Sequence, residues 1–170
     1  MKDLLLKLNA CKEAVEWAGD KTAKEVIATC HRGDWLLWLA YKLEVDDRPF
    51  TLAKGHCANT VRHLMKDERS IKAVDAAIAY GNGEVSKEEL KDAAYASYAS
   101  AASSAASSAY AAASFAAYAP SYAASAAASF AASAAAYASA ASSAAAKKSN
   151  QIETANICRK YLGKLILELC

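Results

Sequence analysis

Cysteine and histidine stand next to each other twice in this chain, and these pairs are the first candidates for chemistry. They are Cys30-His31 and His56-Cys57, and His63 follows further along. Zinc ligands usually lie about two to five residues apart, whereas adjacent side chains on a helix point in different directions. No charge partner or helix start marks an activated thiol for a Cys/His nucleophile pair. The spacing therefore favours buried structural cysteines over a metal centre.

Motifs of the common enzyme classes do not occur in the sequence. It has no Gly-x-Ser-x-Gly, no glycine-rich phosphate loop and no His-Glu-x-x-His. The paired acids at 46–47 and 88–89 fall in an expected loop and an expected first helical turn, where solvated charge is the usual role. We interpret the chain as a protein without enzymatic activity, and we expect no cofactor.

The most specific local pattern is GDWLLWLA at residues 33–40. Trp35 and Trp38 are three residues apart, so a helix presents both indoles on one face. Such a pair often serves only as core. Trp and Arg also dominate the energetic centres of protein interfaces, and Arg32 and Asp34 stand beside the pair. We therefore predict Arg32, Asp34, Trp35 and Trp38 as partner-binding residues.

The segments that must position these residues have helical hydrophobic spacing, and none has the alternation of a strand. This pattern predicts an all-α helical bundle. The expected helices span residues 4–17, 23–30, 35–43, 51–65 and 68–80, then 86 into an alanine-rich tract, 151–162 and 165–169.

Polar residues mark several of the expected helix ends. Thr22 with Glu25, and Ser86 with Glu89, match the capping-box pattern, in which each side chain bonds the other's backbone. We expect Asp34 to cap the helix over 35–43 and Asn150 to start the helix over 151–162. Gly163 is a candidate cap or kink, and Gly81-Asn82-Gly83 a turn.

Residues 93–146 carry no charge and consist of Ala, Ser, Tyr, Phe and the single Pro120. Alanine has the highest helix propensity, and proline breaks a helix interior. The tract therefore predicts Ala/Ser/Tyr-rich helices that fold back near Pro120 and pack closely through their small side chains. Its many serines and its lack of Leu, Ile and Val argue against a membrane span.

The totals fit one domain in a reducing compartment. The chain has 170 residues, a formal net charge of +2 and five cysteines, an odd number that does not suit a secreted disulfide scaffold. We expect a single cytoplasmic all-α domain over 1–170, with a conventional helical part at 1–85, alanine-rich helices at 86–146 and a C-terminal helix at 150–170. The balanced charge does not suggest a nucleic-acid partner.

Several stretches together resemble a known family. They are NACKEAVEW at 9–17, GDWLLWL at 33–39, the helix ending at Tyr80 before Gly83-Glu84, the Ala/Tyr-rich middle and ANICR at 155–159. In these features the chain resembles the bacterial immunity proteins of polymorphic toxin systems, the Imm-5-like family. The resemblance implies a cytoplasmic protein that binds and neutralises a protein toxin. This chain has Ser and Ala where relatives often place acids in the alanine repeat, which argues against inhibition by negative charge there.

The leading hypothesis is thus a binding protein that occludes a protein toxin. A phage-encoded inhibitor or sponge of a host defence component is a second hypothesis, and the genes next to this one distinguish the two. An ice- or surface-binding array is a third, although such arrays favour regular Thr/Ala repeats and this tract has no Thr. A self-associating alanine face could also make a homodimer.

Overall fold

The computed structural model describes residues 1–65, 67–101 and 143–170, and every regular element in these residues is helical. The all-α bundle expected from the sequence is therefore confirmed. The elements are α1 (Lys2–Lys7), α2 (Lys12–Ala18), α3 (Ala23–Thr29), α4 (Gly33–Lys42), α5 (Asp47–Asn59), the short 3-10 helix η1 (Arg62–Leu64), α6 (Glu68–Asn82), α7 (Lys87–Ala101) and α10 (Ser143–Leu169).

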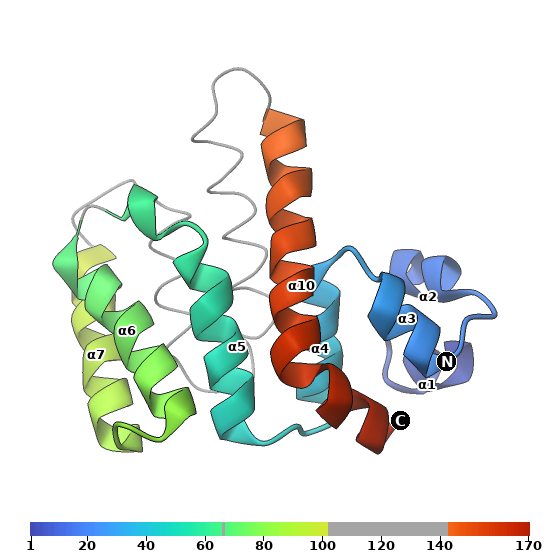
Figure 1. The fold of residues 1–170 in the computed structure, drawn as a ribbon, viewed down its shortest axis with the longest axis horizontal. Coiled ribbons are helices and arrows are strands. Elements are labelled where there is room, and N and C mark those ends of the chain that lie inside the picture. Colours follow the sequence, from blue (N-terminus) through green and yellow to red (C-terminus); the bar gives the residue numbers. More distant parts are fainter. Residues whose placement is uncertain (66, 102–142) are drawn as a thin grey trace.

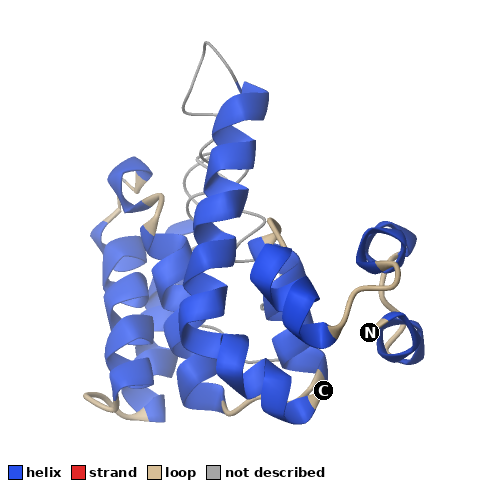
Figure 2. Ribbon diagram, turned by 45° about the vertical axis from the view of Figure 1, so that its right-hand side comes forward, coloured by secondary structure: helices blue, strands red, loops and turns tan. Residues whose placement is uncertain are grey.

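The C-terminal helix α10 stands in the middle of the described part of the chain (Figure 1). It packs against α3, α4 and α5, and α5 continues the bundle through α6 to α7. One apolar core joins α1–α5 to α10, and a second lies between the end of α5, α6 and α7. Figure 2 shows α1 and α2 set to one side of the bundle, where they pack mainly on each other.

Both capping boxes expected from the sequence are present. Thr22 Oγ1 accepts from the backbone N–H of Glu25 at 3.2 Å, and the Glu25 carboxylate accepts from the Thr22 N–H at 2.8 Å. Ser86 and Glu89 make the same pair of bonds at 3.2 and 2.8 Å. These backbone and side-chain bonds lower the pKa of both glutamates, because they favour the charged carboxylate. Local sequence alone therefore fixes the starts of α3 and α7.

The single N-terminal helix predicted over residues 4–17 is wrong. The chain breaks into α1 and α2, and Asn9 between them has a φ of 58°. Asn tolerates this left-handed conformation better than most residues, because its short side chain can bond locally. The hydrophobic spacing continues across the break, which is why periodicity alone missed it.

The helix predicted over 51–65 starts and ends earlier than expected. It begins at Asp47, and Pro49 sits in its first turn. A proline is harmless there, because the first backbone N–H groups of a helix have no intrahelical partner. The regular helix ends at Asn59 and gives way to η1.

The C-terminal helix also differs from the prediction, since α10 is continuous from Ser143 to Leu169. Asn150 does not start it: the side chain is buried, and its amide donates to Thr60 Oγ1 at 2.9 Å. Gly163 does not cap α10, because the helix runs on to Leu169. At the end of α6, by contrast, Gly83 does terminate the helix, with a left-handed φ of 83°.

The alanine-rich tract is described only at its two ends. Residues 93–101 continue α7, and residues 143–146 begin α10. Three expectations concern residues that lie otherwise outside the described part. They are the close packing of Ala-rich helices, the turn near Pro120 and the division of the chain at 86–146. Among residues 1–65, 67–101 and 143–170, no helix combines the length and apolar character needed to cross a lipid bilayer.

Close helix contact is made by glycine in the described residues. A Cβ added to Gly81 of α6 would lie 2.7 Å from Leu52 Cα on α5, and one added to Gly33 of α4 would lie 2.7 Å from the carbonyl carbon of Thr154 on α10. Contacts this short do not occur at real Cβ atoms. Glycine is therefore required at both helix crossings.

A pair of glycine substitutions tests this packing. Gly81→Ala should lower the free energy of unfolding by about 1–3 kcal/mol, because backbone atoms must move apart. Gly163→Ala is the matched control: its Cβ would meet Ile27 Cγ2 at an ordinary 3.5 Å. It should raise stability by about 0.5–1 kcal/mol, as replacing a glycine inside a helix usually does. Urea unfolding measures both, and equal effects of the two changes would contradict the packing.

A polar cluster around Asp47 ties α5 to α6 and α7. The Asp47 carboxylate accepts from the Tyr80 hydroxyl at 2.9 Å, from Lys87 Nζ at 2.8 Å and from Thr51 Oγ1 at 3.4 Å. Lys54 lies on the same helix and is 1% exposed. Burial lowers the pKa of its amine to about 8, although nearby Asp47 opposes the shift. The cluster therefore contains a lysine that titrates close to neutral pH.

The buried Lys54 predicts a pH dependence of stability. Between pH 8 and its ordinary pKa of 10.5, the amine loses its proton in the folded chain and keeps it in the unfolded one. The unfolded state then binds more protons, so the free energy of unfolding rises with pH. Relative to that of Lys54→Met, the free energy of unfolding of the wild type should rise by on the order of 1 kcal/mol per pH unit in this window. Denaturant unfolding at several pH values measures the difference in free energy of unfolding between the two proteins. Titratable groups common to both proteins cancel in this difference. A difference that stays constant from pH 8 to 10.5 would contradict the prediction.

Candidate functional site

The site is built around the first turn of α4. The helix begins at Gly33 with Arg32 at the capping position, so the prediction that Asp34 caps the helix is wrong. Asp34 lies in the first turn, where a negative charge is stabilised by the helix dipole. Its carboxylate pairs with Arg32 in a two-bond fork, at 2.8 Å from Nε to Oδ1 and 2.6 Å from Nη2 to Oδ2.

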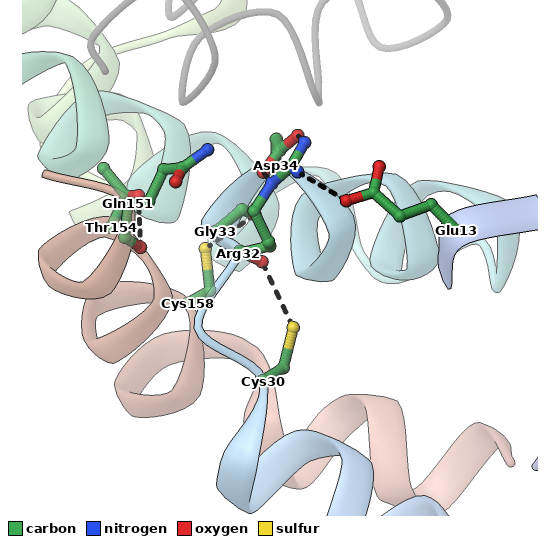
Figure 3. A network of polar contacts seen from close by, with 8 residues as sticks. All are labelled: Glu13, Cys30, Arg32, Gly33, Asp34, Gln151, Thr154 and Cys158. Atoms are coloured by element: carbon green, nitrogen blue, oxygen red, sulfur yellow. Dashed lines mark hydrogen bonds and ion pairs between the residues drawn. The ribbon is translucent and has the colours of Figure 1, made fainter. Parts of the chain in front are cut away.

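Arg32 contacts three neighbours, and Figure 3 shows two of them, Asp34 and Glu13. Besides Asp34, its Nη1 lies 3.7 Å from a Glu13 carboxylate oxygen on α2. Its guanidinium also stacks 4.7 Å from the centroid of the Trp35 ring. The hydrogen bonds that Arg32 donates to Asp34 are the main cause that raises the pKa of Arg32. Both carboxylates and one indole therefore hold this side chain in place.

The turn before α4 is held from α10. Arg159 donates from Nη1 to the carbonyl oxygens of Cys30 at 2.6 Å and Ile27 at 3.3 Å, which closes the C-terminal end of α3. Cys30 Sγ in turn donates to the Arg32 carbonyl at 3.4 Å, and Cys158 Sγ donates to the Gly33 carbonyl at 3.6 Å. The backbone of the site is thus fixed by α10, which lies more than a hundred residues away in sequence.

Aromatic rings from α2 and α4 meet beside Arg32. The ring centroids of Trp17 and Trp35 are 5.9 Å apart, and the His31 ring lies 6.0 Å from Trp17 and 6.4 Å from Trp35. Lys21 Nζ stands 4.7 Å from the Trp17 centroid. The sequence did not identify Trp17 as a site residue, because nothing in its own segment shows that α2 folds against α4.

An apolar cavity of about 230 Å³ lies between α1–α2 and α3–α4. All three tryptophans of the chain line it, and each is partly exposed. Of the predicted site residues, Asp34, Trp35 and Trp38 are in its wall, and Arg32 covers Trp35 and Asp34 from outside. The full lining is Leu5, Ala10, Cys11, Ala14, Trp17, Ala18, Val26, Cys30, Asp34, Trp35, Leu36, Trp38 and Leu39.

The cysteine and histidine pairs do not converge on a reactive centre in the described residues. Cys57 and Cys158 are buried with their sulfurs 3.9 Å apart. Burial raises the pKa of Cys30 to about 11 and the pKa of Cys158 well above its ordinary value, so both remain thiols at neutral pH. His56 stacks on Tyr161 with ring centroids 4.7 Å apart. No group of three or more His, Cys, Asp or Glu residues in the described ranges is placed to hold a metal ion.

Comparisons of the chain with protein-family models, with curated proteins and with solved structures find no match.

The buried fork between Arg32 and Asp34 can be compared with an exposed one. Asp34→Asn should lower the free energy of unfolding by about 1–3 kcal/mol, because it replaces a charged hydrogen-bond acceptor whose side chain is only 11% exposed. Arg62 and Asp75 also form a two-bond fork, through Nη1 and Nη2, with side chains 38% and 54% exposed. Asp75→Asn should therefore change stability by no more than about 0.5 kcal/mol. Chemical denaturation measures the free energy of unfolding of both variants. A larger loss of stability for Asp75→Asn than for Asp34→Asn would refute the prediction.

Proposed function

We propose that this chain is a non-enzymatic binding protein that neutralises a protein toxin, as an immunity protein does, by direct contact through the surface around Trp35. The observation that carries the proposal is the gathering of every tryptophan in the chain at one partly exposed cavity, beside Arg32. Tryptophan and arginine are the residue types most enriched at the energetic centres of protein interfaces. A surface of this composition is suited to holding a partner.

The way the surface is held in place supports the same function. Arg32 is fixed by Asp34, Glu13 and the Trp35 ring, and the turn that carries it is bonded to Arg159 of α10. Side chains already fixed in the free protein lose little conformational entropy when they bind. The site therefore resembles a preorganised binding surface.

The chemistry of the cavity wall supports binding over catalysis. The wall is mostly apolar, and both oxygens of its one carboxylate, on Asp34, accept hydrogen bonds from Arg32. The thiol of Cys30, also in the wall, has its pKa raised by burial to about 11. This thiol therefore stays protonated near neutral pH, and the Asp34 oxygens are already bonded to Arg32, which suits a fixed contact surface.

Co-expression tests the proposal. The genes on either side of this one should be expressed with and without it, and complex formation measured by pull-down and cell survival. A neighbour that is toxic alone should be bound and neutralised. Arg32→Ala and Trp38→Ala should each weaken binding of the purified partner by about tenfold or more. Circular dichroism of each variant should confirm that it is folded.

Lys164→Ala is the control, because this exposed residue lies on α10 outside the cavity lining and should leave affinity unchanged. Two results would remove the proposal. One is that no neighbouring product is bound or neutralised; the other is that all three variants bind like the wild type.

A further inference from the structure

The cavity has two walls of different origin. One wall comes from α1, α2 and the turn between them, including Leu5, Ala10 and Ala14; the other comes from α3 and α4. Cys11 in the turn is exposed, and the indoles of Trp17 and Trp38 are partly exposed, so the cavity opens to solvent beside them. A group from outside can therefore reach it without unfolding the core.

The charged side chains around the cavity lie against an opposite charge or an aromatic ring of the protein. Arg32 lies against both Asp34 and Glu13, and Lys12 pairs with Glu16 at 3.6 Å. Lys21 and Lys42 stand over the rings of Trp17 and Trp38. A charged ligand that enters the mostly apolar cavity would have to give up its water, which is costly in an apolar site. The environment therefore favours an uncharged occupant.

The size of the cavity indicates what that occupant is. An apolar protein cavity of about 150 Å³ is large enough to bind benzene. A volume of about 230 Å³ thus accommodates one aromatic ring with its attached carbon. The surrounding indoles provide edges and faces for the offset or edge-on contacts that aromatic pairs prefer.

From these observations we infer that the cavity receives one uncharged aromatic side chain, of phenylalanine type, from the protein partner. The inference rests on the proposed function and adds the chemistry of the contact: a single ring inserted between the α1–α2 wall and α4. The ring would replace solvent in contact with three indoles. It would act as the anchor around which Arg32 and Glu13 form a polar rim.

Toluene is the analogue of the phenylalanine side chain and serves as the probe. Because all three tryptophans line the cavity, tryptophan fluorescence of the intact protein reports on its occupancy. Toluene should give a saturable fluorescence change and raise the melting temperature. Benzoate and benzylammonium carry the same ring with a negative or a positive charge, and each should bind about tenfold more weakly or worse.

Variants that fill the cavity separate specific binding from adsorption to the surface. Ala14→Leu and Ala10→Leu place extra carbon atoms in the wall, and each should abolish the toluene response while circular dichroism shows a folded protein. Ala28→Leu is the matched control, since Ala28 is exposed on α3 and outside the lining. It should bind toluene as the wild type does.

The results distinguish this inference from the proposed function. Two results overturn the inference that the cavity receives an aromatic side chain, whatever the pull-down shows. One is the absence of saturable toluene binding; the other is equal toluene binding by the wild type and both filled variants. A partner found by co-expression should bind Ala14→Leu at least about tenfold more weakly than Ala28→Leu; equal affinities also overturn the anchor. If toluene binds but co-expression finds no protein partner, the proposed function is overturned. A partner protein is then also excluded as the source of the aromatic ring.

Discussion

The contact between Gly33 and Thr154 is the constraint on which the candidate site depends. The first residue of α4 lies so close to α10 that no side chain fits between them. Cys158 and Arg159, one turn further along α10, then bond the carbonyl of Gly33 itself and that of Cys30 just before it. Where α10 runs therefore decides where α4 starts, and with it the positions of Arg32, Asp34 and Trp35.

The second half of the bundle depends on a different interaction. Asp47 collects hydrogen bonds from Tyr80 and Lys87, and Gly81 lets α6 approach α5 closely. Asp47 is partly buried, and a carboxylate taken out of water is costly unless such partners are present. The two halves meet along α5 and α10, where Asn150 bonds Thr60 and the sulfurs of Cys57 and Cys158 touch. These polar and sulfur contacts join the α5 side of the bundle to α10.

Features that depend on a few neighbouring residues could be predicted from the sequence. The helical class follows from hydrophobic period, and the starts of α3 and α7 follow from side chains three residues apart that cap each other. Asn150 carries a similar local signal and yet lies inside a continuous helix, because tertiary contact with Thr60 outweighs its capping tendency. The break at Asn9 leaves no mark in the hydrophobic pattern.

The candidate site was only half predictable for the same reason. Arg32, Asp34, Trp35 and Trp38 stand together in sequence, and their helical spacing places the two indoles near each other. Trp17 and the cavity depend on how α2 folds back, which no local pattern encodes. The α10 partners Thr154, Cys158 and Arg159 act across more than a hundred residues, so only tertiary structure identifies them.

Nuclear Overhauser measurements on the isotope-labelled protein test the seating of α4 on α10 most directly. The account predicts strong contacts between the Gly33 α-protons and the Thr154 side chain, together with contacts between the Trp17 and Trp35 indole rings. Indole contacts without any Gly33–Thr154 contact would show that the site forms without α10 and would contradict the central claim.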